Sequence, residues 1–275
     1  EALADDLIVL VAGFQGVSTT RDVTTLGRGG SDTTAVALAA AIDAEVCEIY
    51  TTASGLSSAD PRIVPEARKL AYVSFEEMLE MAASGAKVLQ LRSVEYARTH
   101  AVRIHCRSSF EDSPGTVVLG EDETMEHPLI TAVTHSAEEA RITLLGVPDR
   151  PGAAASIFRA LADAGCNVDT IIQNEPRGEG RDAEVSFTIS SEDLRIAEHA
   201  LEPILSDLGI SSVDTDPEIG KVSIVGAGMR SHPGVAAQVF ETLAAQGINI
   251  EMISTSPIKI SCVIRADHVP QAVQA

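Results

Sequence analysis

Residues 141–173 read RITLLGVPDRPGAAASIFRALADAGCNVDTIIQ, and residues 221–255 read KVSIVGAGMRSHPGVAAQVFETLAAQGINIEMIST. The two stretches are versions of one unit, in which Pro151-Gly152 matches Pro233-Gly234. An internal repeat constrains the architecture strongly, because each copy must form one supersecondary unit. The repeat predicts two similar small domains in the second half of the chain.

Each copy carries the signals of a β-α-β unit. An alternating apolar run, such as Ile142 and Leu144, is typical of a strand, and the Pro-Gly pair then opens an apolar-faced helix. Gly165 and Gly247 can end these helices in the left-handed conformation, and a second apolar run follows each of them. We therefore expect two small α+β domains.

The composition limits the class of protein. The chain has 275 residues, 45% of them hydrophobic, and can bury a substantial core in two or three domains. No apolar run approaches the ~18 residues that a membrane span requires, and no signal peptide is recognisable. The formal net charge of −20, without a basic stripe, disfavours nucleic acid and membrane surfaces as partners. We expect a soluble cytoplasmic protein.

The cysteines and histidines do not predict a metal site. The four cysteines contain no C-x-x-C pair, and the seven histidines contain no H-x-x-x-H spacing that would place two ligands on one helix face. We expect reduced structural thiols and no metal bound by protein side chains alone. The chain enters the apolar strand LIVLVAG almost directly after Glu1, so we also expect it to be the later part of something larger.

A glycine-rich loop lies in residues 24–42, TTLGRGGSDTTAVALAAAI. Its alanine-rich part predicts a helix from Thr33, with Ser31 or Asp32 as N-cap. Glycines before a helix let backbone N–H groups approach an anion, and the guanidinium of Arg28 can bind a carboxylate with two hydrogen bonds. The alternative is a tight turn without a ligand, because G-x-G-G alone is a weak signal. The gathering of Arg28, Ser31 and Asp32 at one loop favours a ligand site.

Two further signals follow this loop. Ser74 and Glu77 form a predicted capping box for an amphipathic helix that ends at Gly85. Lys87 comes directly after that end, and it is either a solvated lysine or a phosphate ligand at the start of another helix.

These motifs together resemble a known family, the aspartokinases of the actinobacterial lysine- and threonine-inhibited type. The similarity rests on GFQG at 13–16, TTLGRGGSDTTA at 24–35, ADPRIVP at 59–65, FEEMLE at 75–80 and SGAKVL at 84–89. The paired repeats resemble ACT modules, which bind amino acids. The resemblance runs along nearly the whole chain, and it implies phosphorylation of the β-carboxylate of L-aspartate by Mg-ATP, with feedback regulation by lysine and threonine.

The resemblance also implies a domain plan. Residues 1–115 would be the C-terminal part of an amino-acid-kinase α/β sandwich, and residues 116–125 a linker. Residues 126–137 would give a strand to the second ACT domain. The two ferredoxin-like (βαββαβ) ACT domains would span 138–212 and 213–275. Such proteins assemble as homo-oligomers through their ACT domains, or as α2β2 complexes with a separate regulatory subunit.

Site residues follow from the same resemblance. The aspartate substrate would be held by Arg28, Gly29, Gly30 and Ser31, with Asp32 as the catalytic residue that positions phosphate-binding lysines. The nucleotide side would include Thr51, Arg62 and Lys87. Lysine and threonine would bind at Asp149, Asn167, Asp169 and Gln173 in one repeat and at Asn249, Ile250, Ser254 and Thr255 in the other. From the residues alone, Asn167 and Asn249 are equally well explained as helix-exit turn residues.

The sequence departs from the family in its nucleotide segment. The family reads T-D-V-D-G-V-Y-T-A-D-P-R, whereas residues 51–62 read TTASGLSSADPR, so Thr52 and Ser54 replace two aspartates and Ser57 replaces an aromatic residue. The family's K-x-G-G segment, which supplies a lysine to the transferred phosphate, is also not in this sequence. By itself the chain is not expected to be a competent kinase. The alternative function is a catalytically impaired regulatory pseudoenzyme or amino-acid sensor subunit.

Overall fold

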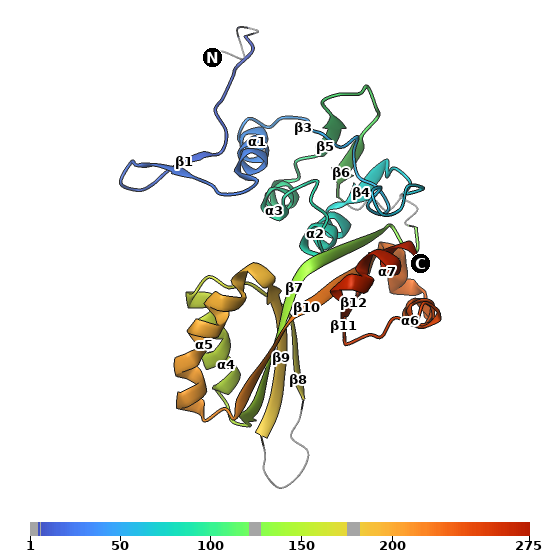
Figure 1. The fold of residues 1–275 in the computed structure, drawn as a ribbon. Helices are drawn as coiled ribbons and strands as arrows, with labels where there is room; N and C mark the ends of the chain where they lie inside the picture. Colours follow the sequence, from blue (N-terminus) through green and yellow to red (C-terminus); the bar gives the residue numbers. More distant parts are fainter. Residues whose placement is uncertain (1–4, 6, 121–127, 175–181) are drawn as a thin grey trace. The chain divides into compact units, whose positions relative to one another are not determined.

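The computed structural model describes residues 5, 7–120, 128–174 and 182–275. These residues form two compact units, each of mixed α/β structure as predicted (Figure 1). The first unit comprises Glu1–Thr134, Ile224–Pro233 and Pro257–Lys259, and the second comprises His135–Ser223, Gly234–Ser256 and Ile260–Ala275. No helix in the described ranges is both long and apolar enough to cross a membrane.

Among its described residues, the first unit contains three α-helices, a four-stranded sheet and a short hairpin (Figure 1). Its elements are β1 (Gln15–Val17), β2 (Val23–Thr25), α1 (Gly30–Ala41), β3 (Cys47–Thr51), β4 (Tyr72–Ser74), α2 (Phe75–Ala83), α3 (Leu91–His100), β5 (Ile104–Ser108) and β6 (Thr116–Leu119). The sheet order is β3-β5-β6-β4, in which β3 is parallel to β5 and β6 is antiparallel to β5. Val36, Met78, Val94 and Ile104 form the fully buried centre of the core.

The start of α1 differs from the expectation. The N-cap is Gly29, which has φ 74° and makes no side-chain cap, so Ser31 and Asp32 lie in the first turn of the helix. The physical reason is space as well as conformation, because a Cβ atom on Gly29 would lie 1.9 Å from Cγ of Gln90. Only glycine allows the chain to turn into the helix this close to Gln90.

The predicted capping box of α2 is confirmed. The Ser74 hydroxyl accepts the N–H of Glu77, and a Glu77 carboxylate oxygen accepts the N–H of Ser74. This exchange satisfies two backbone donors that a helix N-terminus would leave unpaired. The helix ends at Ala83, and Gly85 follows with positive φ.

Residues 116–119, which the domain plan assigned to a linker, form β6 of the first unit. Thr116 and Val118 are fully buried, and the Thr116 hydroxyl donates to the carbonyl of Leu70 while accepting the N–H of Leu56. The acidic composition that follows concealed this short alternation of buried and half-buried residues. Residues 121–125 of the predicted linker lie outside the described residues.

One six-stranded sheet carries both repeats. Its elements are β7 (Ala132–Pro148), α4 (Ala153–Asp163), β8 (Val168–Asn174), β9 (Asp182–Ser190), α5 (Leu194–Leu208), β10 (Ser212–Val225), α6 (Val235–Ala245), β11 (Met252–Ser256), β12 (Lys259–Arg265) and α7 (Val269–Gln274). The sheet order is β11-β12-β10-β7-β9-β8. Each repeat therefore has a four-stranded ferredoxin-like order, and the two orders share the long strands β7 and β10.

The helices of the repeats begin and end as the sequence predicts. Gly165 and Gly247 follow α4 and α6 with φ of 79° and 71°, the left-handed conformation of a helix end. In the first repeat α4 and α5 pack against one face of the sheet, where Ile157, Leu161 and Phe187 are fully buried (Figure 1). The edge strands of the sheet are β8 and β11.

Candidate functional sites

The glycine turn of the first unit gathers the four residues predicted to bind substrate. Arg28, Gly29, Gly30 and Ser31 lie together where the loop enters α1, and Arg28 and Ser31 are exposed. The N–H of Gly30 donates to the carbonyl of Gly27 at 3.0 Å, which closes the turn. The arrangement presents a guanidinium, a hydroxyl and a helix N-terminus to solvent, and these groups suit an anionic ligand.

Asp32 connects this turn to the next helix pair. Its half-buried carboxylate accepts a hydrogen bond from the backbone N–H of Gln90, the N-cap residue of α3. Burial raises the pKa of Asp32, and the hydrogen bond from Gln90 opposes this rise only in part. Gln90 thus touches both Gly29 and Asp32, although no sequence motif marks it. In the structure, Asp32 fixes the beginning of α1 against the beginning of α3.

The residues predicted to bind nucleotide lie on three separate segments. Thr51 is the last residue of β3, Arg62 lies in the turn after Asp60, and Lys87 lies in the loop between α2 and α3 rather than at a helix start. The guanidinium of Arg62 is paired with Asp60 at 2.7 Å, although the Arg62 side chain is 86% exposed. The pair uses Nε and Nη2 of the guanidinium.

The predicted nucleotide segment carries hydroxyl groups at Thr52 and Ser54, where the resemblance implies carboxylates. Ser54 Oγ accepts a hydrogen bond from the ammonium of Lys69. The backbone of Ser57 pairs with that of the same lysine in an isolated antiparallel β-bridge. A serine cannot neutralise the lysine charge as an aspartate would, so Lys69 adds positive charge beside this segment.

The residues predicted to bind effectors fall into two groups in the second unit. Asp149 follows β7, Asn167 precedes β8, and Asp169 and Gln173 lie in β8. Asn249 and Ile250 precede β11, and Ser254 and Thr255 lie in it. Since β8 and β11 are opposite edges of one sheet, a single chain does not bring the two groups together.

Asp169 is already part of an ion cluster around a buried lysine. Lys221 of β10 is 3% exposed, and its Nζ lies 2.5 Å from Asp169 Oδ2 and 3.1 Å from Glu139 Oε1 of β7. Burial alone would lower the pKa of the Lys221 ammonium, but the two carboxylates outweigh it and raise the pKa. The cluster fixes the orientation of Asp169, and sequence analysis did not identify Lys221 or Glu139.

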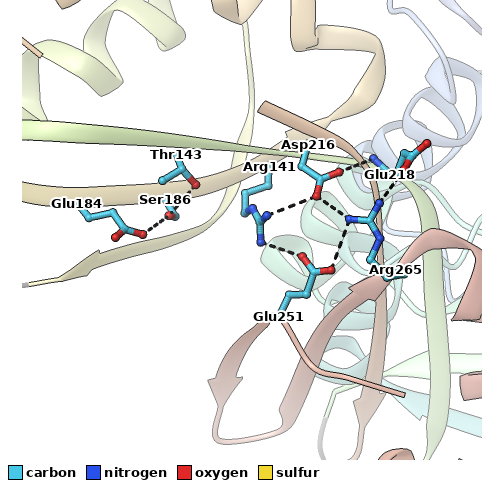
Figure 2. A network of polar contacts seen from close by, with 8 residues as sticks. All are labelled: Arg141, Thr143, Glu184, Ser186, Asp216, Glu218, Glu251 and Arg265. Atoms are coloured by element: carbon cyan, nitrogen blue, oxygen red, sulfur yellow. Dashed lines mark hydrogen bonds and ion pairs between the residues drawn. The ribbon is translucent and has the colours of Figure 1, made fainter. Parts of the chain in front are cut away.

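A second polar network lies in the same unit (Figure 2). Arg141 Nη1 donates to Glu251 at 2.8 Å, and Arg265 Nη1 donates to Asp216 at 2.6 Å. Burial would raise the pKa of Asp216, but its hydrogen bonds with the Glu218 N–H and Arg265 outweigh this effect and lower the pKa. A cavity of about 680 Å³ adjoins Arg141 and Glu251. Its other lining residues are Thr143, Leu145, Ile172, Asn174, Glu184, Ser186, Ser212, Val213, Asp214 and Met252.

Comparison with known proteins assigns the two halves of the chain. Residues 1–108 match the amino acid kinase family, and residues 141–209 and 222–275 each match an ACT domain. The whole chain is 56% identical to the aspartokinase of Mycobacterium tuberculosis over 277 residues. Over 54% of the chain and 95% of its relative, it is 42% identical to the regulatory subunit of aspartate kinase from Thermus thermophilus, with a TM-score of 0.50. The chain belongs to the aspartokinase family.

Solved aspartokinases resemble almost the whole chain. E. coli aspartokinase III in complex with aspartate and ADP matches 95% of this chain and 58% of its own, with 28% identity and a TM-score of 0.78. The same enzyme in complex with lysine and aspartate matches with a TM-score of 0.70. The chain spans 66% of the length of the M. tuberculosis aspartokinase. The predicted fold class, a partial amino-acid-kinase domain followed by two ACT domains, is confirmed.

Proposed function

We propose that this protein phosphorylates the β-carboxylate of L-aspartate with Mg-ATP, on the route to lysine, threonine and methionine. We further propose that its ACT domains bind lysine and threonine as feedback inhibitors. The observation that carries the proposal is the 56% identity to an aspartokinase along the whole chain. The E. coli relative that was solved with aspartate and ADP, and also with lysine, supports both parts.

The glycine turn is the proposed substrate site. The guanidinium of Arg28 would bind a carboxylate of aspartate with two hydrogen bonds, and the N-terminus of α1 would stabilise negative charge at the same point. Asp32 would act as a positioning residue, because its carboxylate is already bound to the Gln90 N–H. Phosphoryl transfer depends mainly on such positioning and on charge neutralisation.

The proposed nucleotide side comprises Thr51, Arg62 and Lys87, which can contribute a hydroxyl and two cations. When bound, Mg²⁺ supplies neutralisation of phosphate charge. The described ranges contain no group of three or more His, Cys, Asp or Glu side chains suited to a metal. Mg²⁺ often keeps few protein ligands and binds through substrate phosphates, so we infer that it would reach this site with the nucleotide.

The edge positions of β8 and β11 support an oligomer. An exposed sheet edge can pair with an edge from another chain, because its backbone groups lack partners within the sheet. Pairing β8 of one copy with β11 of another would bring Asp169 and Gln173 close to Ser254 and Thr255. A homo-oligomer would form both lysine and threonine sites in this way, and an α2β2 assembly with a regulatory subunit would do so equally.

An assay of the full-length protein tests the catalytic proposal. ADP release should require aspartate, and Arg28→Ala should raise the KM for aspartate at least about tenfold, since a lost charged hydrogen bond is worth roughly 1.5–3 kcal/mol. Arg98→Ala, at an exposed position in the last turn of α3, should leave this KM unchanged. Equal kinetics for the two variants would contradict the assigned role of Arg28.

The alternative is a regulatory pseudoenzyme or sensor subunit. It is favoured by Thr52, Ser54 and Ser57, which remove two carboxylates and an aromatic ring from the nucleotide segment. Titration calorimetry distinguishes the two functions: heat with lysine or threonine but none with Mg-ATP would support the alternative. Binding of Mg-ATP together with turnover would exclude it.

A further inference from the structure

Glu77 has a second role beyond its capping box. Its side chain is almost fully buried, and Oε2 is used by the hydroxyl and N–H of Ser74. The other oxygen, Oε1, accepts the hydroxyl of Thr131 at 2.6 Å and the N–H of Ala227 at 3.0 Å. One carboxylate therefore joins α2 to two segments that lie 54 and 150 residues later in the chain.

Those two segments continue directly into the ACT sheet. Thr131 immediately precedes β7, and Ala227 lies two residues after the end of β10. The segments are also joined to each other, because the N–H of Thr131 donates to the carbonyl of Val225 at 2.8 Å. The ends of these two neighbouring strands are therefore fixed to the beginning of α2 through Glu77.

Two more contacts make this junction rigid. Lys259, the first residue of β12, pairs with Glu80 of α2 at 2.9 Å. A Cβ atom on Gly226 would lie 2.4 Å from the carbonyl oxygen of Leu129, so the two segments pack without free space. Hydrogen bonds have donor–acceptor distances of about 2.5–3.2 Å, so shifts of β7 or β10 that move the donors beyond this range would break the contacts to Glu77.

The junction also reaches the predicted nucleotide segment. The N–H of Val133, the second residue of β7, donates to the carbonyl of Ser58 at 2.7 Å. Ser58 belongs to the stretch 51–62, and its N–H and hydroxyl both bond to the backbone of Arg68. At the start of β7, Thr131 thus contacts α2 and Val133 contacts the predicted nucleotide segment.

The charge of Glu77 is stabilised where it lies. Burial raises the pKa of its carboxyl, but hydrogen bonds from Thr131, Ala227 and Ser74 outweigh burial and lower the pKa. The buried Glu77 carboxylate therefore holds both segments in place. Loss of either hydrogen-bond donor would leave part of the buried charge unpaired, which costs free energy.

We propose that Glu77 is a positioning residue that transmits the state of the ACT sheet to α2 and the nucleotide segment through its hydrogen bonds with Thr131 and Ala227. This inference rests on the proposed function. Effector binding at the sheet edges shifts β7 or β10, and Glu77 passes the shift to the kinase part. Loss of the Thr131 hydroxyl weakens the transmission without touching substrate, nucleotide or effector.

The test compares two threonines in the full-length protein. Thr131 and Thr134 are equally buried, at 5% exposure, but the Thr134 hydroxyl has no hydrogen-bond partner among the residues that the structure describes. Thr131→Val therefore removes a hydrogen bond to Glu77, and Thr134→Val removes only an unpaired hydroxyl. Thr131→Ser keeps the hydroxyl and serves as the rescue variant.

We expect Thr131→Val to bind lysine and threonine by calorimetry as the wild type does, with basal kcat unchanged. Its inhibition at saturating effector is measured as the ratio of kcat/KM without effector to kcat/KM with effector. This ratio should fall at least about threefold, which is smaller than the roughly 5–150-fold effect of typical allosteric coupling. Thr134→Val and Thr131→Ser should retain wild-type inhibition. Unchanged inhibition in Thr131→Val, or equal losses in both valine variants, would overturn the role of Glu77.

Failure of the proposed function would look different. If the wild type shows no turnover, the enzyme assignment fails, and if it shows turnover without inhibition, the proposed feedback fails. Hydrogen exchange still tests the junction in both cases. Lysine or threonine should then change amide protection in α2 of the wild type but not in α2 of Thr131→Val. No change in the wild type, or the same change in both proteins, would overturn the inference.

Discussion

Replacing Lys221 with methionine removes the ammonium group that Glu139 and Asp169 both contact. Removing one partner of a buried ion pair costs about 3–5 kcal/mol, because the remaining charge stays desolvated. The Asp169 side chain is 35% exposed and regains hydration, whereas the Glu139 side chain is only 11% exposed and does not. We therefore expect the lower end of this range, a loss of about 3 kcal/mol from the free energy of unfolding.

Urea unfolding followed by far-UV circular dichroism measures this loss. With an m-value on the order of 2 kcal/mol/M, the midpoint of Lys221→Met should fall by about 1.5 M. Adding Glu139→Gln to Lys221→Met should restore much of the lost stability, because no unpaired buried carboxylate then remains at position 139. The raised pKa of Lys221 makes its contribution complete at neutral pH, and the difference from wild type should shrink only as the pH rises above the ordinary value of 10.5. A midpoint shift below about 0.3 M would refute the reasoning.

Two further predictions concern the first unit and the cysteines. Gly29→Ala should destabilise the protein by about 3 kcal/mol in urea unfolding, from the left-handed backbone and the overlap with Gln90. Gly27→Ala, with similar φ and no atom within 4 Å of the new Cβ, should cost only about 1 kcal/mol, and equal losses would contradict the overlap. Burial raises the pKa of Cys106 and of Cys262 to about 11, so iodoacetamide should label them at pH 7.5 only after urea unfolds the protein. Rapid labelling of the folded protein would contradict this.

Local patterns in the sequence were sufficient for much of the fold. The capping box at Ser74 and Glu77 and the helix ends at Gly165 and Gly247 depend on residues only a few positions apart, and the structure confirms them. The repeat predicted two similar units, and the matched ACT domains confirm this. The structure differs where a glycine rather than a polar residue caps the helix, as at Gly29.

Contacts between distant segments could not be predicted in the same way. Gln90 touches the glycine turn, although α1 and α2 separate the two in sequence, and no neighbouring residue indicates this contact. In the sequence, Lys221 has the pattern of an ordinary strand lysine. Its partners Glu139 and Asp169 lie on β7 and β8, so only the folded sheet reveals the ion pairs. The capping box identified Glu77, but its bond to Thr131 depends on tertiary structure.

The shared strands join the two repeats into one sheet. A ferredoxin-like unit needs four strands, and two separate units would need eight, whereas the sheet contains six because β7 and β10 serve both repeats. Neither repeat can then lose its outer strands without exposing strands that the other also uses. The sharing also forces β8 and β11 to opposite edges, so each predicted effector group is available to a second chain. The ends of the shared strands are the segments that Glu77 holds. Under the proposed role of Glu77, a ligand that reorders either edge would act on strands common to both repeats and, through them, on α2.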